Sequence, residues 1–131
     1  AGRLGGGAAI HLLRTSVAQY AGDLLPGASD DWILPLQERL REHYLAALGR
    51  LINLLVDQHD LAGALQAAQR LVAAAPLREE PYRHLIRVHA LAGDTVAARQ
   101  AYAVCVAMRA REFDASPSPA TEAVYRQFVD E

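Results

Sequence analysis

The chain has no lysine, so all 13 of its basic residues are arginine, and 15 acidic residues bring the formal net charge to −2. Proteins that bind nucleic acid need an excess of positive charge, because much of their affinity comes from cations that neutralise phosphates. We therefore expect no direct binding of nucleic acid by this segment.

Cysteine and long apolar runs are also scarce. The single cysteine, Cys105, excludes an internal disulfide and a cysteine-based zinc site. No apolar run approaches the ~18 residues of a membrane span, and no signal-peptide pattern opens the chain. These absences predict a cytoplasmic protein without membrane contact. Residues 1–7 read AGRLGGG, and we interpret them as a tag remnant or a linker.

Aromatic residues make up only 6% of the chain, whereas alanine is abundant. A core with few aromatics must be built from leucine, isoleucine, valine and alanine, and close helix packing suits these side chains. Alanine and leucine also have the highest helix propensities. At 131 residues the chain is long enough for one domain with a core of its own. The composition therefore predicts an all-α domain.

The most informative feature is an internal repeat with a period of 34 residues. Several residues recur identically at that distance: Leu51, Ile52, Asp60, Ala64, Gln66, Ala67, Val72 and Ala73 return as Leu85, Ile86, Asp94, Ala98, Gln100, Ala101, Val106 and Ala107. This is the period of the tetratricopeptide helix-turn-helix unit, which buries its apolar face only by stacking on neighbours. The repeat predicts a tetratricopeptide-like right-handed helical repeat, a short α-solenoid that binds partners more often than it catalyses reactions.

Apolar spacing and cap residues predict where the helices lie. Asp30 and Asp31 are candidate caps for a long helix that begins near Trp32, has Pro35 in or beside its first turn, and runs to about Gln58. We expect Trp32 to anchor its start. The remaining predictions are ranges: a first helix over 8–20, repeats over about 45–78 and 79–112, a terminal helix over about 118–130, and one domain over 8–131.

Particular residues have predicted roles within these helices. Asp60 and Asp94 precede helices as N-caps, and Ser118 caps the last helix ahead of Pro119. Ala64 and Ala98 fall where the paired helices of each repeat touch, so both should be buried. The inward face of the long helix is predicted to consist of Leu45, Leu48, Leu51, Ile52 and Leu55.

Four ordered stretches resemble the bacterial transcriptional activator domain of Streptomyces antibiotic regulatory protein-type regulators. They are YAGDLLPG, DDWILPLQERLREHYLAAL, PLREEPYRHLIRVHALAGDTVAARQAY and SPSPATEAVY, and the resemblance spans about residues 9–129. It implies a regulatory role in transcription through contacts with a DNA-binding domain, RNA polymerase or a second copy. Two other hypotheses stay open: a tetratricopeptide scaffold in a signalling ATPase or cyclase, and an enzyme.

No residue pattern indicates catalysis, a cofactor or a metal. The histidines do not have zinc-binding spacing: they are His11, His43, His59, His84 and His89. We expect His89 to be a core histidine and Cys105 to be a buried, inert thiol. We therefore predict a non-catalytic domain without cofactor, whose partners are proteins.

The candidate binding residues are Asn53, Arg83 and Arg87, which by repeat position face the concave groove where tetratricopeptide proteins bind ligands. Glu79 is placed to pair with Arg83 four residues on, whereas Arg87 has no acid three or four residues away on its helix. Arg87 is thus either an ordinary solvated side chain or an anion contact. In the second case the three residues together could receive a carboxylate or an acidic segment.

Overall fold

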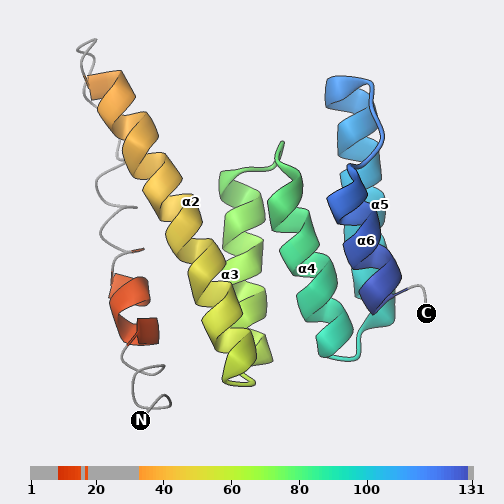
Figure 1. Cartoon of the computed structure of the whole chain (residues 1–131), viewed down its shortest axis with the longest axis horizontal. Helices are drawn as coiled ribbons and strands as arrows, with labels where there is room; N and C mark the ends of the chain where they lie inside the picture. The colour runs from red at the N-terminus through yellow and green to blue at the C-terminus, as the bar shows by residue number, and fades with distance from the viewer. Residues whose placement is uncertain (1–8, 16, 18–32, 130–131) are drawn as a thin grey trace.

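The computed structural model of the protein describes residues 9–15, 17 and 33–129, and all regular structure in these residues is α-helical. The helices after a short helical segment at 9–15 are α2 (Ile33–Asp57), α3 (Leu61–Ala74), α4 (Glu79–Leu91), α5 (Thr95–Phe113) and α6 (Pro119–Phe128). The predicted all-α helical-repeat fold is confirmed (Figure 1). The predictions for residues 1–7, for Asp30 and Asp31, and for Trp32 lie outside the described residues.

The helices pack mainly on their neighbours in sequence. Helix α2 packs on α3, α3 on α4, and α4 on α5, while α6 returns to pack on α4. A smaller contact joins α2 to α4. Stacking of each unit on its neighbours is typical of repeat proteins, and it places α4 between the two ends of the described helices (Figure 1).

The turns that precede α3 and α5 are built alike. Asp60 Oδ1 accepts a hydrogen bond from the Gly63 backbone N–H at 2.9 Å, and Asp94 Oδ1 accepts one from Ala97 at 3.0 Å. Both N-cap predictions are confirmed. Ser118 occupies the N-cap position of α6, but its side chain makes no capping hydrogen bond. The backbone N–H of Ser118 donates to a side chain of α4 instead.

The larger core lies between α2 and α3. The predicted inward face of α2 is buried, since its residues are 0 to 7% exposed: Leu45, Leu48, Leu51, Ile52 and Leu55. They pack with Ala64, Ala67 and Ala68 of α3, and Ile10, Leu13 and Val17 join the same cluster. The apolar face of the first helical segment is therefore covered by α2 and α3.

The second part of the core surrounds α4. Ile86 packs with Ala98 and Ala101 of α5 and with apolar residues of α6. Ala64 and Ala98 are both 0% exposed, as the repeat predicted. Cys105 is buried as well, and burial raises the pKa of its thiol to about 11. This cysteine is therefore protonated at neutral pH and is a poor nucleophile.

Candidate functional site

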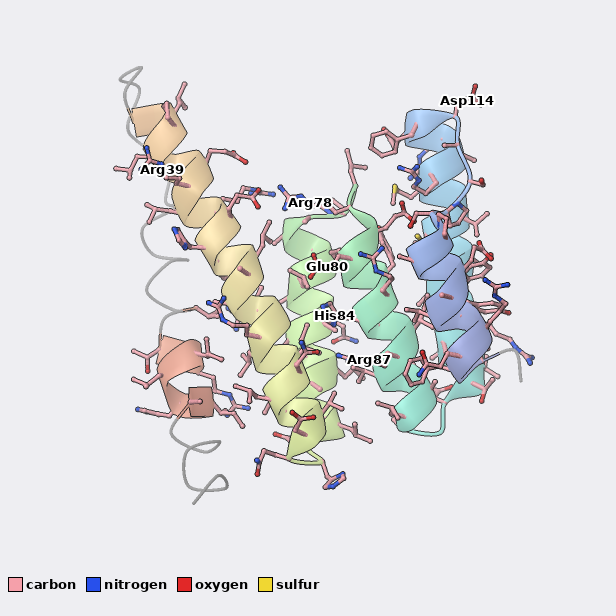
Figure 2. The ribbon with its side chains drawn as sticks, in the orientation of Figure 1. Arg39, Arg78, Glu80, His84, Arg87 and Asp114 are labelled. Carbon is pink, nitrogen blue, oxygen red and sulfur yellow. The ribbon has the colours of Figure 1, made fainter. Side chains whose placement is uncertain are left out.

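The three predicted groove residues line one hollow of about 290 Å³ between α2, α4 and α6. Helix α2 contributes Asn53, α6 contributes Val124, and α4 contributes the other lining residues, which are Glu80, Arg83, His84 and Arg87. Figure 2 shows Glu80, His84 and Arg87 following one another along α4. We call this hollow, defined by these six residues, the α4 groove.

Arg87 is held in the α4 groove by neutral acceptors. Its Nη2 donates to Asn53 Oδ1 at 2.6 Å and lies 3.3 Å from His84 Nδ1. Asn53 and Arg87 are 34 residues apart, so they occupy the same position in successive repeats, and this explains why they meet. The Arg87 Nε–H is buried without a hydrogen-bond partner among the described residues. Burial lowers the pKa of Arg87, partly offset by the charge of Asp57.

His84 lies between the cation and an acid. Since a guanidinium can only donate, His84 Nδ1 accepts from Arg87, which leaves the ring proton on Nε2. That nitrogen is 3.6 Å from Glu80 Oε1. Burial of His84 and the charge of Arg87 lower the pKa of this histidine, although Glu80 acts in the opposite direction. His84 is therefore neutral at pH 7 and does not compensate the charge of Arg87, on which, within the described part of the chain, only the charge of Asp57 acts favourably.

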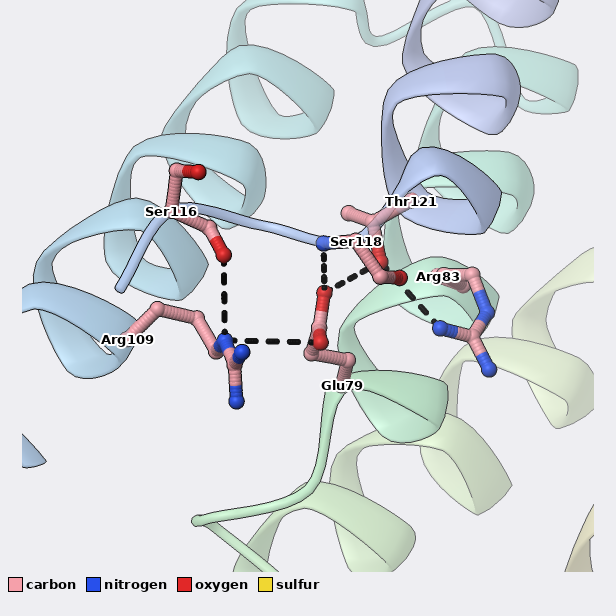
Figure 3. Close-up of polar contacts among 6 residues, drawn as sticks. All are labelled: Glu79, Arg83, Arg109, Ser116, Ser118 and Thr121. Atoms are coloured by element: carbon pink, nitrogen blue, oxygen red, sulfur yellow. Dashed lines mark hydrogen bonds and ion pairs between the residues drawn. The ribbon is translucent and has the colours of Figure 1, made fainter. Parts of the chain in front are cut away.

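Glu79 and Arg83 do not form the predicted pair. Glu79 Oε1 accepts hydrogen bonds from the Ser118 backbone N–H and from Thr121 Oγ1, both at 2.8 Å. Glu79 Oε2 is 3.4 Å from Arg109 Nε, and Figure 3 shows these contacts converging on one carboxylate. An exposed pair four residues apart contributes only about 0.3 to 0.5 kcal/mol, so the partly buried tertiary contacts prevail.

Arg83 turns towards α6 instead. Its Nη1 donates to Thr121 Oγ1 at 3.1 Å (Figure 3), and Thr121 is fully buried. Arg83 thus lines the α4 groove and at the same time fixes the start of α6. No carboxylate forms an ion pair with Arg83 or Arg87 among the described residues.

A second hollow of about 160 Å³ adjoins the α4 groove and shares Glu80 with it. Most of its lining is apolar: Leu45, Ala46, Leu71, Ala75 and Pro81. At its rim, both terminal nitrogens of Arg78 donate to the two carboxylate oxygens of Glu42. We call it the apolar hollow.

The sequence did not identify His84 and Glu80 as groove residues. The sequence signal for both was helical spacing. Glu80 lies four residues before His84 and Arg87 lies three residues after it, so all three share one helix face. His89 was expected in the core, but it is partly exposed. His84 is the histidine of α4 that burial affects, with 13% of its side chain exposed.

The described part of the chain holds neither a metal-binding cluster nor a membrane-spanning helix. No group of three or more histidine, cysteine or acidic side chains there is arranged to hold a metal ion. None of the described helices combines the length and hydropathy that crossing a bilayer requires.

A family model described as "Bacterial transcriptional activator domain" matches residues 6–128, which include α2 to α6 in full. No curated protein and no solved structure matches the chain.

Proposed function

The chain belongs to the bacterial transcriptional activator domain family, and we propose that it acts there as a non-catalytic docking domain. The protein that it contacts would be a DNA-binding domain, RNA polymerase or a second copy of itself, in the cytoplasm. Helical repeats suit this role, because stacked helices provide a rigid concave surface.

We also propose that the described helices form tetratricopeptide-like repeats over about 45–78 and 79–112, and that α6 caps the array within 118–130. The equivalent turns before α3 and α5 support this division, as does the contact between Asn53 and Arg87. In such an array the first helix of each repeat lines the concave side. The α4 groove is then the docking surface.

One observation carries the docking proposal: Arg87 is preorganised, and the charge of Asp57 acts on it without forming an ion pair. Asn53 and His84 hold its guanidinium from one side, and its ion-pairing capacity is unused within the described residues. A fixed cation in a hollow can bind a partner with a smaller loss of side-chain entropy than a mobile surface arginine. Arginine is also enriched among residues that contribute most to protein interfaces.

The test compares variants of the full-length regulator that contains this chain. Arg87→Glu should abolish most reporter activation, whereas Arg99→Glu on the exposed face of α5 and Cys105→Ala should leave it largely intact. Circular dichroism of each variant shows whether the fold is retained. A folded Arg87→Glu protein with full reporter activity would contradict docking through the α4 groove.

A further inference from the structure

We infer that the α4 groove and the apolar hollow together bind an extended protein segment, which places an acidic side chain against Arg87 and an apolar side chain in the hollow. The inference rests on the proposed docking function and specifies the chemistry of the partner.

The acidic half of the recognition follows from the contacts of Arg87. Its Nη2 is engaged by Asn53 and His84 and its Nε–H is buried, so the Nη1 amino group is the donor that remains for a carboxylate. Asn53 accepts from Arg87 through Oδ1, which leaves the Asn53 amide NH₂ available to donate. A charge-assisted hydrogen bond to a carboxylate is about twice as strong as a neutral one. A carboxylate at this point would satisfy donors of both side chains.

The groove favours a single carboxylate over a polyanion. Glu80 lines the same hollow and 63% of its side chain is exposed. Since Glu80 and Arg87 are seven residues apart on α4, about 10 Å separates them along the helix axis. A phosphate chain that followed the groove would be repelled by Glu80 and by Asp57, whereas one carboxylate at Arg87 would meet only the charge of Asp57, which also acts on Arg87.

The apolar half follows from the adjoining hollow. Its volume is about 160 Å³ and its lining is mainly apolar, so it can receive a side chain such as leucine. Of its three charged lining residues, Arg78 and Glu42 neutralise each other, and Glu80 is shared with the α4 groove. The two hollows meet at Glu80. A free small carboxylate would fill only one of them, which favours a continuous segment as the ligand.

The distance along α4 from Arg87 to Glu80, where the two hollows meet, sets the spacing of the segment. An extended chain advances about 3.3 Å per residue, so about 10 Å corresponds to about three residues. We therefore expect a motif in which a leucine and a glutamate are about three residues apart. The groove does not fix the direction of the chain, so both orders are tested.

The experiment is a nuclear magnetic resonance titration of the ¹⁵N-labelled full chain. The probes are acetylated and amidated hexapeptides with leucine and glutamate three residues apart, in both orders. Matched peptides carry glutamine for the glutamate or glycine for the leucine. Sodium acetate and sodium phosphate at equal ionic strength are separate arms. We expect signals of Asn53, His84 and the Arg87 side chain to shift, with affinity about tenfold lower for either matched peptide.

Two variants make the titration specific. Arg87→Gln should abolish the preference for glutamate over glutamine, and Ala46→Phe should fill the apolar hollow and abolish the preference for leucine over glycine. Arg99→Gln is the matched control and should bind like the unaltered chain. Chemical-shift spectra of each variant without peptide report whether it is folded.

Each remaining outcome overturns the inference. Equal binding of the glutamate and glutamine peptides excludes recognition of a carboxylate, and the absence of any shift excludes the segment altogether. Acetate that binds as tightly as the peptides identifies a free carboxylate as the ligand, and preferential binding of phosphate identifies an anion of another class. The docking function is judged separately: if Arg87→Glu abolishes reporter activity while these peptides do not bind, docking stands and only the inferred motif fails.

Discussion

At the scale of single residues, two equivalent turns adopt the same backbone conformation with different side chains. His59 has a φ of 62° and Gly93 a φ of 84°, and the two positions are 34 residues apart. A positive φ suits glycine, but it strains other residues by about 1 kcal/mol. The second repeat therefore has the better turn residue.

This difference predicts opposite effects of two substitutions. His59→Gly should raise the free energy of unfolding by up to about 1 kcal/mol, because it relieves the strained backbone. Gly93→Ala should lower it by about 1 kcal/mol. A Cβ at position 93 would meet no atom within 4 Å, so this loss reports the backbone alone. Urea unfolding measures the change in the free energy of unfolding for both variants. A Gly93→Ala variant that is more stable than the unaltered chain would contradict the positive φ at position 93.

Ala98 tests the packing of paired helices. It is 0% exposed between α4 and α5, so Ala98→Arg should lower the free energy of unfolding by several kcal/mol through overpacking and burial of charge. Ala64→Arg should act similarly in the first repeat. Ala103→Arg is the control, since Ala103 is an exposed alanine of the same helix as Ala98. If thermal denaturation gave the same melting temperature for Ala98→Arg and Ala103→Arg, close helix packing at position 98 would be refuted.

At the scale of elements, the attachment of α6 depends on the carboxylate of Glu79. Burial alone would raise the pKa of Glu79, but hydrogen bonds from Ser118 and Thr121 and the charge of Arg109 lower it below its ordinary value of 4.5. Tyr102 of α5 adds a second link. Its ring stacks on Tyr125 with centroids 3.9 Å apart, and its hydroxyl donates to Glu122 at 2.6 Å.

The lowered pKa of Glu79 predicts acid-sensitive docking of α6. A carboxyl whose pKa is depressed by folding stabilises the native state above pH 4.5, and this contribution is lost as the pH falls through the folded pKa. The near-ultraviolet circular dichroism of the tyrosine stack should therefore decline below about pH 4.5, together with the melting temperature. Glu79→Gln should weaken docking at neutral pH and flatten this dependence. Glu38→Gln, at an exposed acid of α2, should leave the dependence unchanged.

Sequence patterns predicted the elements better than the contacts between them. The caps at Asp60 and Asp94 were predictable, because an N-cap hydrogen bond reaches only three residues along the chain. The buried face of α2 was predictable from helical spacing for the same local reason. The pair of Glu79 with Arg83 was wrong, since Glu79 has partners 39 and 42 residues away. Such partners depend on how α6 folds back, which helical periodicity does not specify.

At the scale of the whole molecule, charge balance predicts that the isolated chain does not bind DNA. The net charge is −2, and some of the arginines are neutralised by pairing, as in Arg78 with Glu42 and Arg109 with Glu79. In a fluorescence anisotropy assay at physiological salt, the chain should therefore show no measurable affinity for duplex DNA. Micromolar binding with a steep salt dependence would contradict this prediction.

The candidate site was predicted in part. The repeat period placed Asn53 beside Arg87, because equivalent residues of stacked repeats become neighbours. It did not predict that His84 stays neutral between Glu80 and Arg87, which depends on burial. Nor did the repeat period predict that Arg83 donates a hydrogen bond to Thr121 of α6. The binding role of these residues stays a prediction.

The contacts of Glu79 with α6 also bear on the order in which the molecule folds. Most helix pairs are neighbours in sequence, so their loops close early and at small entropic cost. The link from Glu79 to Ser118 and Thr121 spans 39 and 42 residues, so it closes a longer loop at a greater entropic cost than the pairing of α4 with α5. Helix α6 should therefore dock last during folding and detach first during unfolding, exposing the apolar side of α4 before the rest of the array opens.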